Sequence, residues 1–346
     1  MIEQPDIQDE SSELYEHFRF VVDQGQAPLR IDKYLMAKIE NASRNRIQNS
    51  AHAGNILVNG KVIKPNYRIK PCDIISIVLA YPPRDTEIYP ENIPIQIVYE
   101  DHDILVVNKM PGMVVHPGHG NFTGTLQNAV LYHLQNGEAG DSGSKPYLVH
   151  RIDKDTSGIL LIAKNELAQT RLAKQFFDHT IDRTYVALVW GNIKPDKGTI
   201  EGNIGRDLRN RLVQTVYDTD EKGRHAVTHY TVLERFGYVT LVECRLETGR
   251  THQIRVHFKH IGHPLFNDEN YGGSEIVKGT TFTKYRQFIE NCFKLLPRQA
   301  LHAKSLGFIH PSIGKFVHFD SDYPEDLRLV IEKWQKYSIH KNPDES

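Results

Sequence analysis

Apolar residues recur at helical spacing near the start of this 346-residue chain. Over residues 29–39 the apolar positions fall on one face of a helix and leave Lys33 and Lys38 on the other. Ser43 is placed to cap a second helix, which the pattern carries to about Ala53, and Gly54 stands where a helix commonly ends. The apolar positions of the first helix are Ile31, Tyr34, Leu35 and Ile39.

A β-hairpin and a further strand are predicted directly after these helices. Two short apolar runs, 56–58 and 61–63, flank Asn59 and Gly60. That pair suits a type I′ turn, in which both central residues need positive φ. Residues 73–77 read as the next strand.

The rest of the chain alternates strand-like runs with helical segments. A helix is expected over 166–179, and no internal repeat is found. This order predicts an α+β protein, with a large mixed and mainly antiparallel sheet carrying helices. The strand-like runs are 95–99, 104–108, 159–163, 185–190 and 239–245.

Prolines around residues 82–94 interrupt all periodicity, as in an extended linker between two domains. The expected organisation is an acidic tail (1–17), a small α/β domain (18–80), a linker (81–92), a larger domain (93–335) and a tail (336–346).

Composition excludes several classes of protein. With 39% hydrophobic and 25% charged residues the chain is typical of folded soluble proteins, and its apolar runs stop far short of a membrane span. The first 17 residues hold six acidic side chains and no Lys or Arg, unlike a signal peptide. Three isolated cysteines build neither a disulfide framework nor a zinc ribbon, so a reducing cytoplasm is expected.

The net charge of −1 hides a strong asymmetry. Nine basic residues against two acidic ones between Arg30 and Lys70 give this segment a local charge of +7. Such a cluster favours phosphate binding, although it also fits a solvated surface.

Polar and charged residues crowd into residues 150–158, directly before the apolar strand 159–163. Loops held by rigid strands often carry catalytic groups, but the same residue types are ordinary turn formers. Spacing does not choose between Asp153 and Asp155 as a functional carboxylate.

Residues 247–263 form a second segment rich in charge. Gly249 ends the preceding strand and Thr251 is a plausible helix cap. An apolar stripe of Ile254, Phe258 and Ile261 is expected until Gly262, with His252, Arg255 and Lys259 on another face. The histidines at 252, 257, 260 and 263 suggest metal, but their spacing lacks the HExxH pattern, so no metal site is predicted.

In a third segment, residues 183–191, a strand places Tyr185 on one face with Ala187 and Val189, leaving room above the ring. A core or surface tyrosine is the simpler alternative. Residues 116–120 fail the spacing of a phosphate-binding loop and are read as a turn.

The small basic domain resembles the alpha-L RNA-binding motif of the ribosomal protein S-four family. The match lies in residues 30–35, Ser43, Arg44, Gly54 and 58–61, while Cys72 stands where that family usually has Gly. The resemblance implies RNA contacts from basic side chains. These are Arg30, Lys33, Arg44, Arg46 and Lys61.

The larger domain resembles the RluA family of RNA pseudouridine synthases, near its RluD and RluC members. The matching segments are 150–158, 183–191, 248–255 and 298–303, and with the basic domain they span about nine-tenths of the chain. This resemblance implies an isomerase that converts uridine in large-subunit ribosomal RNA to pseudouridine. It implies no cofactor and no metal.

The family pattern also assigns roles to individual residues. Asp153, after His-Arg-Ile, becomes the catalytic residue, Arg255 its cation and Tyr185 the ring that stacks on uracil. Arg151 becomes the side chain that fills the gap left by a flipped nucleotide. A bidentate pair between Arg255 and Asp153 is expected to keep the carboxylate ionised. Placement adds Arg250 and Lys259 as phosphate contacts on the same surface.

Three alternatives remain open. The enzyme could act on transfer RNA, the chain could be a non-catalytic RNA-binding factor of ribosome assembly, or the histidines could build a metal-dependent hydrolase. The main expectation is a cytoplasmic monomer that binds RNA without a membrane or small-molecule cofactor.

Overall fold

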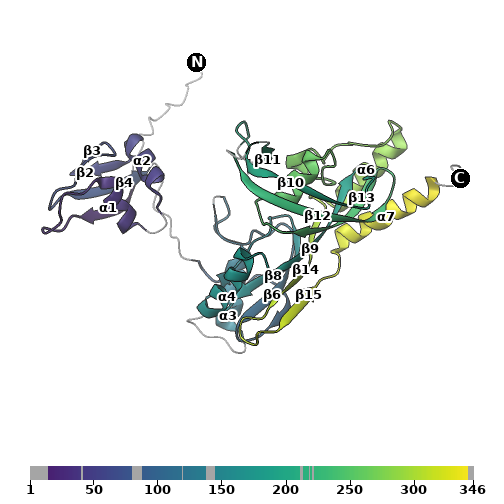
Figure 1. The fold of residues 1–346 in the computed structure, drawn as a ribbon, viewed down its shortest axis with the longest axis horizontal. Helices are drawn as coiled ribbons and strands as arrows, with labels where there is room; N and C mark the ends of the chain where they lie inside the picture. Colours follow the sequence, from purple (N-terminus) through teal and green to yellow (C-terminus); the bar gives the residue numbers. More distant parts are fainter. Residues whose placement is uncertain are drawn as a thin grey trace, which may run out of the picture. The chain divides into compact units, whose positions relative to one another are not determined.

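The computed structural model divides the chain into two compact units, at residues 87 and 88. It describes residues 15–39, 42–79, 88–118, 120–137, 145–210, 213–217, 219 and 222–341. Residues 1–14 of the predicted acidic tail and residues 81–87 of the predicted linker lie outside the described residues. Figure 1 shows both units.

The first unit packs two helices on a small antiparallel sheet with strand order β1-β4-β2-β3. Strand β1 begins at Tyr15, inside the segment predicted as a tail. The core includes Ile31, Leu35, Ile56 and Ile75, none of which is exposed. The elements are β1 (Tyr15–Val21), α1 (Ile31–Lys38), α2 (Arg44–His52), β2 (Ile56–Val58), β3 (Lys61–Val62) and β4 (Ile74–Leu79).

The predicted local signals of this unit are confirmed. Ser43 accepts a hydrogen bond from the backbone N–H of Arg46 and caps α2. Asn59 and Gly60 have φ of 50° and 77°, as a type I′ turn requires. Cys72 adopts φ of 67°, so the turn before β4 forms without the glycine usual in the resembling family.

The second unit is built on one sheet, in which 11 strands are described. Its main path is β11-β10-β12-β13-β9-β14-β8-β6-β5, with β15 beside β14 and β7 beside β8. Only the β14–β8 pair is parallel among the described strands. The predicted α+β class with a mixed, mainly antiparallel sheet is therefore confirmed.

Strands of the second unit are β5 (Gln96–Glu100), β6 (Ile104–Lys109), β7 (Tyr147–Leu148), β8 (Ser157–Ala163), β9 (Asp182–Trp190), β10 (Lys197–Arg206), β11 (Gln214–Tyr217), β12 (Arg224–Arg235), β13 (Val239–Leu246), β14 (Leu301–Ile309) and β15 (Phe316–Asp320). The helices are α3 (Leu126–Asn136), α4 (Glu166–Phe177), α5 (Gln253–His260), α6 (Thr283–Leu295) and α7 (Glu325–Lys341), with a short 3₁₀ turn η1 (Glu269–Tyr271).

Helices pack on this sheet at two places, near β6 and β8 and on the central strands β9 and β13. In Figure 1, α3 and α4 lie beside β6 and β8, whereas α6 and α7 lie toward β13. Trp190, Phe266 and Trp334 centre the core under α6 and α7. Helix α7 runs to Lys341 and Tyr337 packs on that core, so the boundary expected at residue 335 falls inside a helix.

Helix α5 departs from the prediction at both ends. Thr251 is exposed and does not cap it; the cap position is His252, whose backbone is left-handed with φ of 57°. Ile254 and Phe258 are buried as expected, but Ile261 follows the helix and is 36% exposed. The helix is shorter than the pattern suggested because the segment before it turns sharply.

No helix in the described part of the chain combines the length and apolarity needed to cross a bilayer.

Candidate active site

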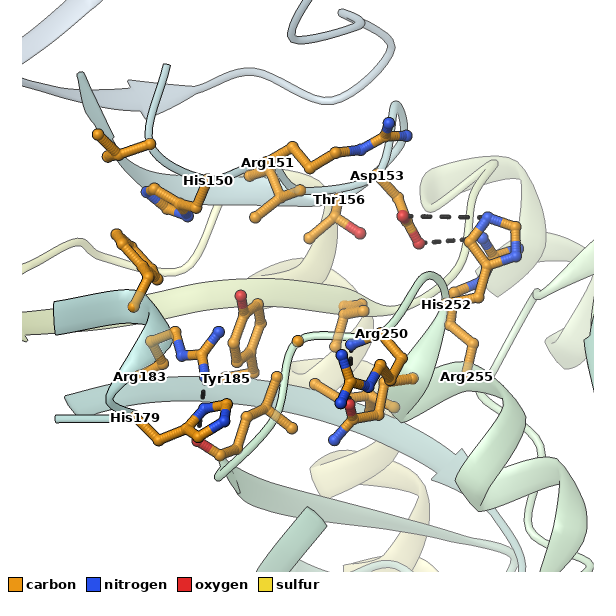
Figure 2. A pocket seen from close by; sticks show the side chains of 18 of the residues that line it. His150, Arg151, Asp153, Thr156, His179, Arg183, Tyr185, Arg250, His252 and Arg255 are labelled. Atoms are coloured by element: carbon orange, nitrogen blue, oxygen red, sulfur yellow. Dashed lines mark hydrogen bonds and ion pairs between the residues drawn. The ribbon is translucent and has the colours of Figure 1, made fainter. Parts of the chain in front are cut away.

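A pocket of about 530 Å³ opens beside the loop that precedes β8. One wall is the segment from Val149 to Thr156, and β9 contributes Arg183 and Tyr185. The segment from Gly249 to Arg255 forms another wall. All three chemistry-bearing segments of the sequence therefore meet at one cavity (Figure 2).

Buried cations hold the loop that carries Asp153. Lys109 is 2% exposed, and its Nζ donates to the carbonyls of Met110, Met113 and Lys154 at 2.8–2.9 Å. Burial lowers the pKa of Lys109 to about 7. One residue further along, Arg298 Nη1 donates to the carbonyl of Asp155 at 2.9 Å. The loop backbone is thus held at two successive carbonyls, those of Lys154 and Asp155.

Close packing of β8 on β14 requires a glycine directly after this loop. Gly158 has φ of 116°, and a Cβ there would lie 2.1 Å from the carbonyl oxygen of Ala303. Any side chain would push the two strands apart, so the loop geometry depends on this residue.

Arg255 joins two carboxylates. Its Nη1 lies 3.2 Å from Asp153 Oδ2, while Nε and Nη2 donate to Asp268 at 2.7 and 2.9 Å. The expected bidentate pair between Arg255 and Asp153 is therefore wrong, because the fork of the guanidinium is occupied by Asp268. Asp268 is fully buried, whereas the Asp153 side chain is 19% exposed toward the pocket.

The electrostatics keep this guanidinium charged. Burial disfavours the charge of Arg255, but hydrogen bonds and charge from Asp268, and then from Asp153, raise its pKa above the ordinary value. Its guanidinium also lies 5.0 Å from the ring centre of Tyr271. Asp153 thus faces a fixed cation at one oxygen and the pocket at the other.

Tyr185 and Arg151 also line this pocket. Tyr185 stands on β9 between Cys244 of β13 and Ala303 of β14. Burial raises the pKa of Tyr185, so its phenol is protonated at neutral pH. Arg151 is exposed at the pocket edge.

The two expected phosphate contacts separate. Arg250 lines the pocket, and its Nε donates to the carbonyl of His225. Lys259 instead lines a second pocket of about 280 Å³, together with the β10–β11 hairpin. Arg250 therefore lines the Asp153 pocket and Lys259 does not; their shared role as phosphate contacts stays a prediction.

In the first unit, Asp32 organises two of the five predicted RNA contacts. This fully buried carboxylate accepts hydrogen bonds from Arg30 and Arg44, whose side chains remain 37% and 48% exposed. Hydrogen bonds from Arg30, and then from Gln48 and Arg44, hold the pKa of Asp32 well below its usual range against burial. The remaining predicted contacts, Lys33, Arg46 and Lys61, are exposed.

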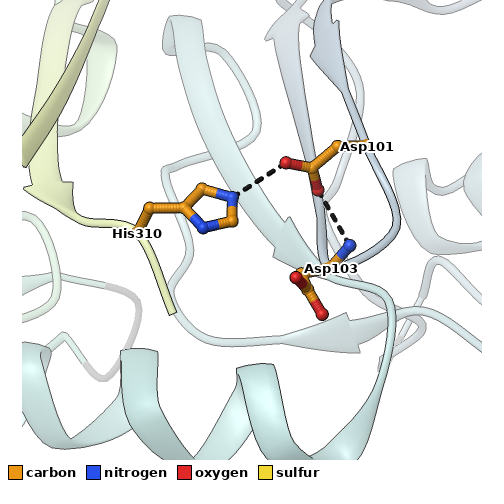
Figure 3. A group of neighbouring side chains, drawn as sticks. All are labelled: Asp101, Asp103 and His310. Atoms are coloured by element: carbon orange, nitrogen blue, oxygen red, sulfur yellow. Dashed lines mark hydrogen bonds and ion pairs between the residues drawn. The ribbon is translucent and has the colours of Figure 1, made fainter. Parts of the chain in front are cut away.

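The histidines of the α5 segment do not gather around a metal-sized space. His257 bonds Thr228 and His263 bonds the carbonyl of Trp190. Among the described residues, the grouping with metal-like spacing is Asp101, Asp103 and His310 (Figure 3). Asp101 accepts from His310 and from the backbone of Asp103, so these groups satisfy one another.

Sequence reasoning missed Asp268, Tyr271, Lys109 and Arg298. Asp268 and Tyr271 follow a buried run, 264–266, in a segment that carried no recognised pattern. The signal that the sequence offered for Asp268 was a charged residue close to the apolar run 264–266. Asp268 meets Arg255 from 13 residues away and Lys109 reaches the carbonyl of Lys154 from 45 residues away, so their roles at the site depend on the fold.

Comparisons with known proteins place the chain in a family. Residues 103–260 match the family model of RNA pseudouridylate synthases, and residues 29–75 match the S4 domain. A relative from Chlorobaculum parvum, named as an uncharacterized RNA pseudouridine synthase, is 47% identical over 89% of this chain and 94% of its own length. The chain therefore belongs to the RNA pseudouridine synthases, with an S4 domain in front, and it is an enzyme of that class acting on RNA.

More specific similarity is to enzymes of ribosomal RNA. The ribosomal large subunit pseudouridine synthase D of Zymomonas mobilis is 41% identical over 88% of this chain and 93% of its own. The solved structure of human RNA pseudouridylate synthase domain containing 1 aligns with a TM-score of 0.51 and 27% identity, over 72% of this chain and 89% of that one. The family model and these relatives confirm the predicted family and the predicted enzyme class.

Proposed function

We propose that this enzyme converts specific uridines of large-subunit ribosomal RNA to pseudouridine, with Asp153 as the catalytic residue. One observation carries the proposal: Asp153 presents a carboxylate to the pocket beside the buried guanidinium of Arg255. The ribosomal substrate is supported by the similarity to ribosomal large subunit synthases and by the basic S4 unit. We place the reaction in the cytoplasm and assign it to a monomer.

The reaction requires few catalytic groups from the protein. The N1–C1′ bond of uridine breaks, the uracil turns, and C5 bonds to C1′; C5 loses a proton and N1 gains one. No net oxidation or hydrolysis occurs. An ionised carboxylate serves whether it attacks the base, attacks C1′ or stabilises positive charge on the sugar. The charged guanidinium of Arg255 contacts one oxygen of the Asp153 carboxylate.

Base access requires the target to leave its stack, at a cost of a few kcal/mol. In our proposal the everted uracil stacks on Tyr185, and Arg151 at the pocket edge occupies the space the base has left. Arg250 contacts an adjacent phosphate. The S4 unit then supplies affinity that depends on charge more than on sequence.

Tritium release from 5-labelled uridine tests the proposal. RNA from a strain lacking the gene is the substrate, so that target uridines are unmodified. We expect release from large-subunit ribosomal RNA without added cofactor, and loss of more than about a thousandfold in Asp153→Asn with RNA affinity retained.

Asp155→Asn is the matched control, because Asp155 shares the loop and its carbonyl, not its carboxylate, binds Arg298. Full activity of Asp153→Asn would end the mechanism. Release from transfer RNA alone would keep the chemistry and replace the substrate.

A further inference from the structure

His252 faces the second oxygen of Asp153. Its Nε2 lies 3.9 Å from Asp153 Oδ1, while Arg255 contacts Oδ2. The imidazole lines the pocket and is 19% exposed (Figure 2). Its backbone is left-handed, a strained conformation that clusters at functional sites. The Asp153 carboxylate therefore lies between two nitrogen-bearing side chains from one segment.

The opposite ring nitrogen is tied to Tyr271. His252 Nδ1 lies 2.8 Å from the Tyr271 hydroxyl, and that oxygen also accepts the backbone N–H of Gln214 at 2.9 Å. A backbone N–H can only donate, so the phenol must place its own hydrogen elsewhere. Among the described residues, His252 Nδ1 is the acceptor within hydrogen-bond distance of the Tyr271 hydroxyl. In a neutral ring this arrangement leaves the proton on Nε2.

The surroundings favour the neutral ring. Asp153 and Arg151 face it from the loop before β8, Arg255 from α5, and Asp268 and Tyr271 from the segment around η1. Burial lowers the pKa of His252; Arg255 and Arg151 lower it too, against the two carboxylates. Tyr271 itself stays protonated, because burial raises its pKa to about 12.

We propose that His252 is a positioning residue for Asp153: a neutral imidazole that directs its Nε2–H at Oδ1, in a tautomer set by Tyr271. The inference rests on the proposed role of Asp153. At 3.9 Å the contact is longer than a direct hydrogen bond. It closes when a uridine fills the pocket, as catalytic contacts of empty sites commonly do. With Arg255 on one oxygen and His252 on the other, the carboxylate cannot rotate away from the nucleotide.

Two substitutions at His252 differ in how far the side chain places its N–H donor. In His252→Gln the side-chain amide extends about as far as Nε2 and keeps an N–H donor, whereas in His252→Asn it reaches only the position of Nδ1. Asn tolerates the left-handed backbone well, so lost folding does not explain its defect. We expect His252→Asn to lower the single-turnover rate about 100-fold and His252→Gln about tenfold or less, both with RNA affinity within about twofold.

Tyr271→Phe tests whether the Tyr271 hydroxyl sets the tautomer of His252. It keeps the ring beside Arg255 and removes only the hydroxyl. Without that donor the neutral ring is less favoured, so His252 gains its proton at a higher pH and pairs with Asp153 as an imidazolium. We expect a rate about tenfold lower at neutral pH, with the acid limb of the pH profile moved to higher pH.

In a double variant with His252→Gln, Tyr271→Phe should cost nothing further, because the amide donor needs no tautomer. Tyr217→Phe is the control, since it removes a hydroxyl hydrogen bond to the carbonyl of Arg206 in the β10–β11 hairpin, outside the pocket.

The outcomes distinguish the two proposals. Wild-type turnover in His252→Asn and Tyr271→Phe, with Asp153→Asn inactive, overturns the positioning role and leaves the proposed function standing. A loss in His252→Asn that appears only as weaker RNA binding also overturns it. Activity in Asp153→Asn removes the proposed function itself.

Discussion

Some residues of the pocket are placed to contact the substrate, and others hold those contact residues in position. Asp153 is partly exposed to the pocket, but its partner Arg255 is 5% exposed and bound on its other side by Asp268. When Asp153 is neutralised, Arg255 keeps both of its hydrogen bonds to the buried carboxylate of Asp268. The chemistry at Asp153 is therefore separable from the stability of the core around Arg255.

This separation predicts opposite profiles for two Asp→Asn substitutions. We expect Asp268→Asn to lower the free energy of unfolding by about 3 to 5 kcal/mol, because it breaks a buried, bidentate ion pair. Asp153→Asn should cost about 1 kcal/mol or less, because Arg255 keeps both bonds to Asp268. Urea unfolding followed by tryptophan fluorescence measures both. Equal losses in the two variants would contradict the division.

Among the elements, α1 and α2 of the S4 unit show how one buried residue arranges a basic surface. Asp32 sits in the first turn of α1 and draws Arg44 from α2 and Arg30 from the segment before α1. Lys33 and Arg46 then stand exposed on the same two helices, and Lys61 at the hairpin. Phosphates can reach these exposed positive charges.

Neutralising three of the basic residues of the S4 unit should weaken the salt dependence of RNA binding. We expect the triple variant Lys33→Gln, Arg46→Gln, Lys61→Gln to bind RNA more weakly and to lower the slope of log K against log salt by about 2 to 3, because fewer counterions are released.

The control replaces Lys284, Lys294 and Lys336 on α6 and α7, which line no part of the Asp153 pocket. An identical change of slope in both triple variants would show that overall charge, and not the S4 unit, sets the salt dependence.

At the scale of the whole molecule, three histidines of the second unit make its free energy of unfolding depend on pH. His150 accepts the backbone N–H of Leu161, and His302 bonds Ser157 and Ser321. Burial lowers the pKa of His150 to about 3, and of His257 and His302 to about 4. Each is depressed below the unfolded value of about 6.5, so each stabilises the fold above that pH and loses this effect as the pH falls.

The free energy of unfolding should therefore fall between about pH 6.5 and 4. The slope approaches about 1.4 kcal/mol per pH unit for each histidine that gains a proton on unfolding. Urea unfolding at several pH values, read from the fully buried Trp190 and Trp334, measures it. His302→Gln should remove one proton from the slope; an unchanged slope would show that this histidine is not linked to unfolding.

The sequence by itself determined the local structure and the chemical class. Ser43 capped its helix, Asn59 and Gly60 formed their turn, and most of the predicted strands and helices formed within a few residues of the predicted bounds, because caps, turns and apolar periodicity act over a few residues. Four ordered segments, 150–158, 183–191, 248–255 and 298–303, were enough to indicate the family. The expected cap at Thr251 and the expected burial of Ile261 were wrong, because His252 takes the cap position with a left-handed backbone and Ile261 lies just after the helix.

Only the tertiary structure decided which groups meet. Asp268 takes the fork of Arg255, Lys109 reaches the carbonyl of Lys154 across 45 residues, and Tyr271 sets the ring of His252. No local rule contains these pairings, because buried charges and donors find partners wherever the sheet brings them together, at any distance along the chain.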